Sequence, residues 1–203
     1  MEIMYSIKDN NFFNNRPFIG FMGESKDLSA IIDDLNEIKL KPNWKVKSII
    51  ENHESLKSLG LNDSILKKKV KDLSDSELKL ITLVRTCELE PNIVILNNLD
   101  LGLNHRIKSN ISKYLKMVNA NSKVNFIVIS NDILFINRIC KHLIISKNKI
   151  IKYQGDILIA IKQGLVSKPP IIEFIDMANE SGANLDYTLD NKELLKAIYR
   201  SVF

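Results

Sequence analysis

The chain has 203 residues, of which 45% are hydrophobic and 26% charged, a composition that excludes a disordered, collagen-like or disulfide-scaffold protein. Its two cysteines, Cys87 and Cys140, lie far apart in apolar helical patterns and predict buried thiols in a reducing cytosol. The net charge of +5 favours acidic partners, and a dense lysine cluster spans 67–71.

The first part of the chain predicts strands and helices that are interrupted by turn residues. Residues 1–20 alternate enough for one or two strands, followed by a glycine-bearing loop. Apolar residues at helical spacing predict a helix over about 27–38. A second helix is expected from Asn43, as its N-cap, to Leu59, where Gly60 stops it.

The middle of the chain combines the lysine cluster with a well-marked helix. No aromatic residue lies between the lysines of 67–71, so we interpret this cluster as a solvated helix end and loop rather than a nucleic-acid surface. The stretch 72–91 predicts a helix with a clear start and stop. Ser74 is its expected N-cap, Glu77 stands at the capping-box position, and Pro91 lies beyond its end.

From residue 92 onward the pattern alternates between strand and helix. Continuous apolar runs predict strands at 92–96, 124–130 and 142–146. Helices are expected between them, at about 104–118 and 132–140. This alternation is typical of an α/β fold with a parallel sheet flanked by helices.

The remainder of the chain predicts a hairpin strand and a short helix over 148–163, and two further helices over 171–203. A Pro-Pro pair separates the two parts. We therefore divide the chain into a main domain, 1–166, and a helical C-terminal region, 167–203.

The stretch GFMGESKD has part of the spacing of a phosphate-binding loop, in which backbone N–H groups and a lysine at a helix N-terminus face an anion. Gly20 and Lys26 match that spacing, and Gly23 lies between them. Ser25 stands at the expected second glycine, and Asp27 at the expected metal-binding hydroxyl. Asp27 is also a good residue for an ordinary helix N-terminus, so both interpretations of the stretch remain open.

Three later stretches follow this one in a recognisable order: LSDSE from Leu73, IVILNNLDLGLN from Ile93 and FIVISND from Phe126. In order and mutual distance they resemble the motifs of ATP-binding cassette (ABC) ATPases, and most of all the energy-coupling-factor subunits that power cobalt and vitamin importers. The resemblance implies a P-loop NTPase-like fold. It also implies a truncated N-terminal half, because no glutamine loop is found, and a small helical C-terminal extension.

The resemblance assigns roles to several residues. Ser74 would contact the γ-phosphate of a partner's nucleotide, although a capping box alone explains it. Asn97 replaces the Asp that binds Mg²⁺, Asn98 replaces the catalytic Glu, and Asn131 replaces the switch His. An amide cannot accept a proton from water at neutral pH. We therefore predict no catalytic residue and no metal ligand set. The candidate nucleotide-binding residues are Gly20, Gly23, Ser25, Lys26, Asp27 and Ser74.

The leading hypothesis is a degenerate ABC-type ATP-binding subunit, a pseudo-ATPase with no independent activity. Its expected partners are an active ABC ATPase subunit or a second copy, paired head to tail, and a transporter's membrane component. ATP would bind weakly, and the lost carboxylates count against Mg²⁺. Two alternatives remain: a weakly ATP-binding and hydrolysing importer subunit, and a nucleic-acid-associated ABC-like protein, although nucleic acid is not the expected partner.

The sequence predicts a cytoplasmic protein, peripheral at the inner face of the cell membrane if it serves a transporter. Acidic residues near the N-terminus leave no apolar core of signal-peptide length. No run approaches the ~20 apolar residues of a membrane helix.

Overall fold

The computed structural model describes residues 2–6, 13, 16–23, 36–148 and 150–202. Within these residues seven strands form one sheet in the order β3-β1-β4-β5-β2-β6-β7. The strands are β1 (Glu2–Ser6), β2 (Phe18–Met22), β3 (Asn36–Glu37), β4 (Ile93–Asn97), β5 (Asn125–Ile129), β6 (His142–Lys147) and β7 (Ile150–Asp156). The four central strands are parallel, whereas β1 pairs antiparallel with β4, and β7 with β6. The predicted parallel sheet is thus confirmed at its centre, and antiparallel strands extend it on both sides.

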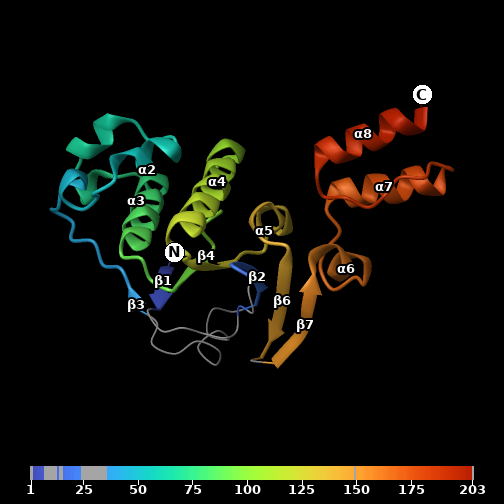
Figure 1. Cartoon of the computed structure of the whole chain (residues 1–203), viewed down its shortest axis with the longest axis horizontal. Helices are drawn as coiled ribbons and strands as arrows, with labels where there is room; N and C mark the ends of the chain where they lie inside the picture. Colours follow the sequence, from blue (N-terminus) through green and yellow to red (C-terminus); the bar gives the residue numbers. More distant parts are fainter. Residues whose placement is uncertain (1, 7–12, 14–15, 24–35, 149, 203) are drawn as a thin grey trace.

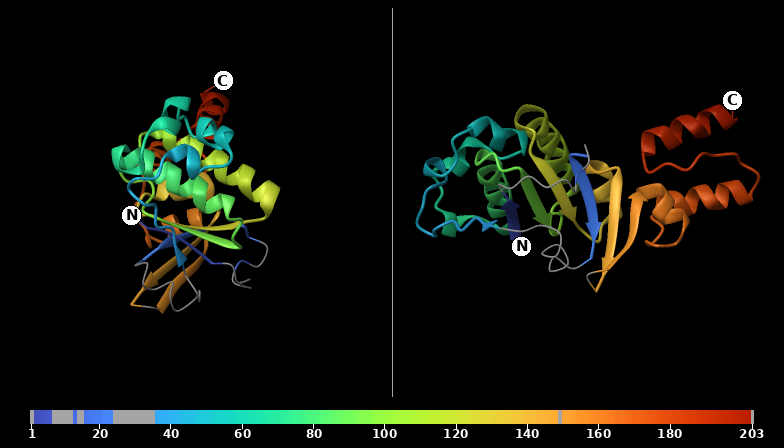
Figure 2. Two further views of the ribbon diagram at one scale, coloured as in Figure 1. Left: turned by 90° about the vertical axis from the view of Figure 1, so that its left-hand side faces the viewer. Right: turned by 60° about the horizontal axis from the view of Figure 1, so that its bottom comes forward.

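Helices α3, α4 and α5 pack on one side of the sheet (Figures 1 and 2). The described helices are α2 (His53–Ser58), α3 (Asp75–Glu88), α4 (His105–Ser122), α5 (Ile133–Ile139), α6 (Ile157–Lys162), α7 (Pro170–Glu180) and α8 (Asn191–Val202), with 3₁₀ turns η2 (Val46–Ser48), η3 (Asp63–Lys67) and η4 (Val70–Asp72). None of these helices combines the length and the apolar character needed to cross a membrane.

Strand β4 contributes side chains to hydrophobic cores on both faces of the sheet. Val94 and Leu96 belong to the large core beneath the helices. Ile93 and Ile95 belong to a smaller core on the opposite face, together with Phe13. This alternation is the period of a strand, and it explains why the run is apolar at every position.

Two of the helices expected in the first part of the chain differ in the structure. The predicted helix over 43–59 is wrong in its first half: Val46 and Ile49 turn into the core through η2, and α2 begins only after Asn52. The side chain of Asn52 accepts the N–H groups of Glu54 and Ser55, so this residue is the N-cap in place of Asn43. The predicted helix over 27–38 lies mostly outside the described residues, and its last part is instead β3.

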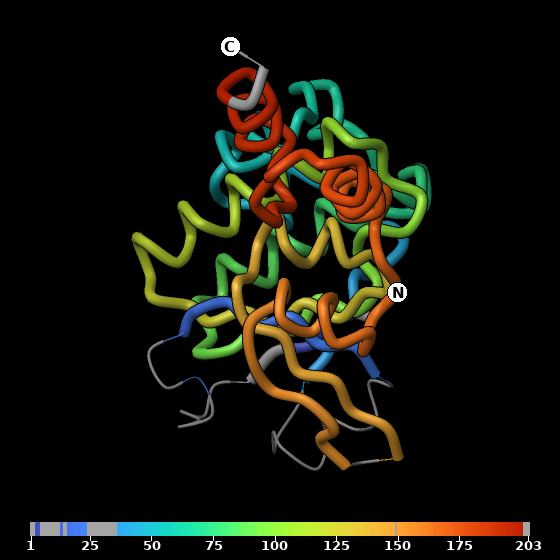
Figure 3. The backbone as a smooth tube through the Cα atoms, turned by 90° about the vertical axis from the view of Figure 1, so that its right-hand side faces the viewer, coloured from blue at the N-terminus to red at the C-terminus, as the bar shows by residue number. Residues whose placement is uncertain are grey.

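The C-terminal helices α7 and α8 stand beyond the β6–β7 edge of the sheet, and the view from that end shows them above the hairpin (Figures 1 and 3). Lys168 and Tyr187 both contact the carboxylate of Asp176. The ammonium of Lys162, in α6, lies 4.3 Å from the ring centroid of Tyr187. Through Tyr187, these polar and cation–π contacts connect the loop between the two helices to α6 and α7.

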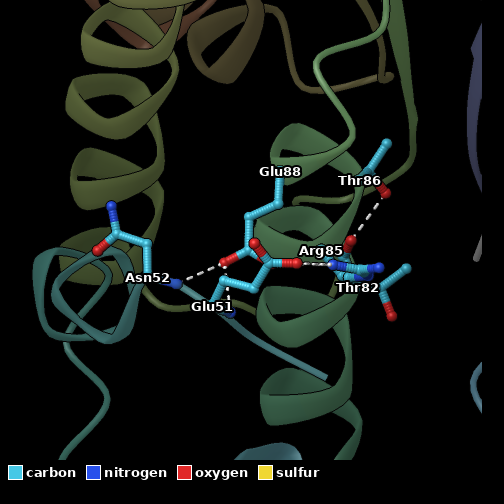
Figure 4. A network of polar contacts seen from close by, with 6 residues as sticks. All are labelled: Glu51, Asn52, Thr82, Arg85, Thr86 and Glu88. Atoms are coloured by element: carbon cyan, nitrogen blue, oxygen red, sulfur yellow. Dashed lines mark hydrogen bonds and ion pairs between the residues drawn. The ribbon is translucent and has the colours of Figure 1, made fainter. Parts of the chain in front are cut away.

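A carboxylate on α3 fastens the segment before α2 to the body of the protein (Figure 4). Oε1 of Glu88 accepts the backbone N–H groups of Glu51 (2.9 Å) and Asn52 (2.8 Å). The side chain of Glu88 is 10% exposed, and Arg85 approaches both Glu88 (3.4 Å) and Glu51 (3.2 Å). Bonds from two N–H groups to an ionised, mostly buried carboxylate are of the strong kind.

We expect Glu88→Ala to lower the free energy of unfolding by about 1–3 kcal/mol, because it leaves two backbone donors without their acceptor. Urea denaturation measures this difference. Glu180→Ala, which removes an exposed glutamate at the end of α7, is the matched control and should change stability by less than about 0.5 kcal/mol. Equal effects of the two substitutions would contradict the role of Glu88.

Candidate functional site

The carboxyl ends of three neighbouring parallel strands lie level at one edge of the sheet. Asn97 of β4 pairs with Ile129 of β5, and Ile129 pairs with Phe21 of β2. The N–H of Asn98 donates to the carbonyl of Ile129 (2.9 Å), which continues this alignment past the strand. Ligands of open α/β sheets bind at this kind of edge. The register therefore brings the ends of β2, β4 and β5 together, and with them the described site residues Gly23, Asn97 and Asn98.

The two glycines of the phosphate-loop-like stretch are both closely packed. Gly20 lies buried inside β2, and a Cβ there would fall 2.2 Å from Cγ2 of Ile136, so α5 packs directly on this residue. A Cβ on Gly23, just after β2, would fall 2.9 Å from a ring carbon of Phe21 and 3.0 Å from the carbonyl of Ser146. Packing within the protein thus accounts for both glycines, and their binding of nucleotide stays a prediction. Ser25, Lys26 and Asp27 lie outside the described residues.

Asn97 and Asn98 stand together where the sequence resemblance expects two carboxylates. The Nδ2 of Asn98 donates to Oδ1 of Asn97 at 3.0 Å. Asn98 has a φ of +51°, in the left-handed region that asparagine tolerates better than most residues. Asn131 lies in the exposed bend after β5, and Asn104 is the N-cap of α4. The backbone conformation at Asn98 and the capping role of Asn104 therefore favour asparagine at these two positions, independently of any catalytic role.

Ser74 has the structural role that the sequence predicted. Its hydroxyl accepts the N–H of Glu77, and the Glu77 carboxylate accepts the N–H of Ser74, so the capping box is confirmed. Nearby, the buried Lys79 donates to the carbonyl of Leu101 (2.6 Å) and pairs with Asp75 (2.9 Å). This lysine joins the start of α3 to the loop after β4. A contact of Ser74 with a partner's phosphate remains a prediction.

Sequence reasoning missed a charged cluster at the same edge. Asp100 is 3% exposed, and its Oδ2 lies 4.0 Å from the ammonium of Lys108. Lys108 also pairs with Asp132 at 2.9 Å and so bridges the loops after β4 and β5. The second oxygen of Asp100 has no hydrogen-bond partner among the described residues. The sequence feature that could have indicated this cluster is Asp100, a charged residue between Leu99 and Leu101.

Asp132 is held in its charged form. Burial raises the pKa of Asp132. The hydrogen bond from Lys108 and the N–H groups of Phe135 and Leu134 lower it by more than burial raises it, so the pKa lies below the usual range. The described residues contain no group of three or more His, Cys, Asp or Glu side chains able to hold a metal ion. The amides of Asn97 and Asn98 are weak ligands for Mg²⁺, so the described part of this edge does not fit a resident metal ion.

A hollow of about 620 Å³ lies at the opposite, amino-terminal edge of β2 and β6, lined in part by Arg16, Phe18 and His142. It is far along the strands from the asparagines and is not part of the candidate site. Burial, and then the charge of Arg16, lower the pKa of His142. Its Nε2 is buried and has no hydrogen-bond partner in the described part of the chain.

Comparisons with known proteins give both sequence relatives and structural neighbours, although no family model matches the chain. The nickel import ATP-binding protein NikE of Shigella flexneri is 26% identical over 104 residues, and NikE of Escherichia coli K12 is 25% identical. The match covers 51% of this chain, and the chain spans only 39% of the length of these relatives.

Among solved structures, the dimeric bacterial ABC transporter cassette MJ0796 matches with a TM-score of 0.56 and 15% identity, over 70% of this chain and 85% of the other. The cbiO1 protein of Clostridium perfringens, part of the transporter complex cbiONQ, matches with a TM-score of 0.56 and 13% identity, over 88% of this chain and 94% of the other. The chain therefore has the fold of an ABC ATPase cassette. The named relatives are import ATP-binding proteins, and the two named structural neighbours belong to ABC transporters, as the motifs implied.

The depressed pKa of Asp132 predicts a pH-dependent contribution to stability. Because this pKa is lower in the folded than in the unfolded state, the contribution is present above the unfolded value of about 4 and is lost as the pH falls through the folded value. Asp132→Asn keeps an acceptor for the cap of α5 but removes the charge. We expect it to cost about 0.5–1 kcal/mol at pH 7, and much less at about pH 3.

Urea denaturation at the two pH values measures this effect. Asp186→Asn, at an exposed loop position, should show no comparable pH dependence and serves as the control. A cost of Asp132→Asn that is the same at both pH values would show that the charge of Asp132 does not contribute.

Proposed function

We propose that the chain is a catalytically impaired ABC-type ATP-binding subunit that serves an importer as a structural or regulatory partner. The observation that carries this proposal is the pair Asn97 and Asn98 at the end of β4, in the register where the family resemblance expects the metal-binding and catalytic carboxylates. The named relatives support the importer context, since NikE is an import ATP-binding protein and cbiO1 is part of a transporter complex.

The chemistry of the strand ends explains the impairment. Phosphoryl transfer from ATP needs a metal ion to neutralise developing charge and a group that positions or deprotonates the attacking water. Asn97 and Asn98 offer amides that bond to one another. Two carboxylates at the same edge, Asp100 and Asp132, are engaged by Lys108. We infer that ATP, if it binds, does so weakly through the loop that contains Lys26, without a productive Mg²⁺.

A second candidate, a weakly hydrolysing importer subunit, is favoured by one observation. Asp100 lies three residues past Asn97 and has one carboxylate oxygen without a partner among the described residues. The carboxylate of Asp100 could accept a proton from water near the strand ends. Hydrolysis that depends on Asp100 would therefore select this second function.

The expected partners are another cassette subunit and a membrane component, by analogy with the dimeric MJ0796 cassette and the cbiONQ complex. The C-terminal helices offer an apolar surface for such a contact. The sequence predicts two apolar stripes here, and in the structure Ile172 and Ile175 are buried, whereas Phe174, Met177, Leu195 and Tyr199 are exposed. The buried part of the stripes stabilises the region itself, and Phe174, Met177 and Leu195 offer exposed apolar side chains for assembly.

We predict that the purified chain releases phosphate from ATP no faster than its own Lys26→Ala variant. The missing base alone accounts for a loss of about 10²–10⁴-fold, and the missing metal site adds to that. Asn98→Glu alone should not restore turnover, because Asn97 still lacks a carboxylate. A phosphate-release assay with Mg²⁺ makes these measurements.

Two results separate the alternatives. Turnover of about 1–100 s⁻¹, as in other phosphoryl-transfer enzymes, would refute the impaired subunit. Slow turnover that is abolished by both Lys26→Ala and Asp100→Asn would establish the weakly hydrolysing enzyme instead.

A further inference from the structure

Two lysine-rich segments that are distant in the sequence form one exposed surface. An antiparallel bridge joins Lys45 to Lys69. Backbone hydrogen bonds extend it on both sides, from Val46 N–H to Lys68 (3.0 Å) and from Val70 N–H to the carbonyl of Trp44 (2.9 Å). The surface lies at the end of the molecule opposite α7 and α8 (Figures 1 and 2). We call it the lysine face, and its exposed members are Lys39, Lys41, Trp44, Lys45, Lys47, Lys67, Lys69 and Lys71.

The charge of the lysine face is not compensated within the described protein. None of its seven lysines has an ion-pair partner among the described residues, where Lys57, Lys68, Lys79 and others do. Three of the four carboxylates of the segment 39–72 are occupied elsewhere: Glu54 and Asp63 pair with Lys57, and Glu51 pairs with Arg85. The segment 39–72 carries nine lysines and four acidic residues, a net charge of five that equals the net charge of the whole chain.

The fold also places an aromatic residue among these lysines. Trp44 is 42% exposed, and the ammonium of Lys41 lies 5.3 Å from its ring centroid. The sequence shows no aromatic residue within 67–71, and this was the reason for interpreting the cluster as an ordinary solvated loop. The bridge between Lys45 and Lys69 removes that reason, because it brings Trp44 beside the cluster.

The backbone of the lysine face is held in place by buried side chains and an ion pair. Val46, Ile49 and Val70 are buried beneath it, and Lys68 turns inward to pair with Glu77 on α3 at 2.8 Å. Exposure alternates along 67–71, so the odd-numbered lysines point to solvent while Val70 points to the core. The Glu88 carboxylate holds the following segment (Figure 4). The lysines are therefore presented by an ordered backbone, which lowers the entropic cost of binding through them.

We propose that the lysine face docks on the surface of an anionic lipid membrane, with Trp44 at the level of the headgroups. Lysines close to such a surface each raise partitioning roughly fivefold, and tryptophan is enriched at membrane interfaces. All seven exposed cations are lysines and a single aromatic lies among them. A single-strand nucleic-acid surface uses several stacking aromatics and favours arginine, so lipid is the better match. The proposal does not depend on nucleotide binding.

The full chain and vesicles of about 30 mol% phosphatidylserine in phosphatidylcholine provide the test, with pure phosphatidylcholine as the neutral comparison. Trp44 is the only tryptophan of the chain, so its fluorescence reports on this face alone. We expect the anionic vesicles to bind the protein, to shift the Trp44 emission to the blue, and to release the protein in about 0.5 M salt.

Matched charge reversals locate the binding surface. Lys45→Glu with Lys69→Glu should weaken co-sedimentation with anionic vesicles by at least about tenfold. Lys113→Glu with Lys152→Glu changes the net charge equally at exposed positions on α4 and β7, and it should have little effect. Urea midpoints of both variants establish that they remain folded.

Three results would overturn the proposal. Absence of binding of the unaltered chain to anionic vesicles refutes it directly. Equal weakening by the two pairs of substitutions would mean that net charge, and not this face, drives binding. Binding to a single-stranded oligonucleotide at concentrations that leave the vesicles unbound, with the same dependence on Lys45 and Lys69, would assign the face to nucleic acid.

Discussion

Parallel pairing of β4 with β5, and of β5 with β2, is the constraint on which the rest of the structure depends. The side chains of β4 are buried in cores on both faces of the sheet, so the strand cannot slip by one residue without exchanging the two cores. That fixed register places Asn97 beside Ile129 and brings the carboxyl ends of the three strands to one edge. Any ligand bound there meets side chains that the sheet has positioned.

The proposed loss of catalysis leaves this architecture intact because asparagines near the end of β4 have local structural roles. Asn98 occupies a left-handed backbone position, and Asn104 caps α4. Lys108 holds Asp100 and Asp132, and Lys79 joins α3 to the loop after β4. A cassette of this kind can keep its shape, and with it the surfaces that partners contact, while its strand ends lack the groups for phosphoryl transfer.

Local signals in the sequence predicted those elements that depend on local interactions. The capping box of α3 and the buried run of β4 need only neighbouring residues and a core, and both are confirmed. The helix expected from Asn43 failed because Val46 and Ile49 are drawn into the core as a 3₁₀ turn. The pairing of Asp100 with Lys108 and of Lys45 with Lys69 depends on tertiary folding, and no periodicity in the sequence reveals it.

Calorimetric titration of the chain with ATP, in Mg²⁺ and in EDTA, tests most directly whether the asparagine pair at the end of β4 has removed the metal site. The account predicts weak or undetectable binding that Mg²⁺ does not tighten, because Asn97 offers an amide where a carboxylate would hold the ion. Affinity that rises by about tenfold or more with Mg²⁺, and that falls on Asp100→Asn, would contradict this prediction and show that Asp100 holds the metal ion.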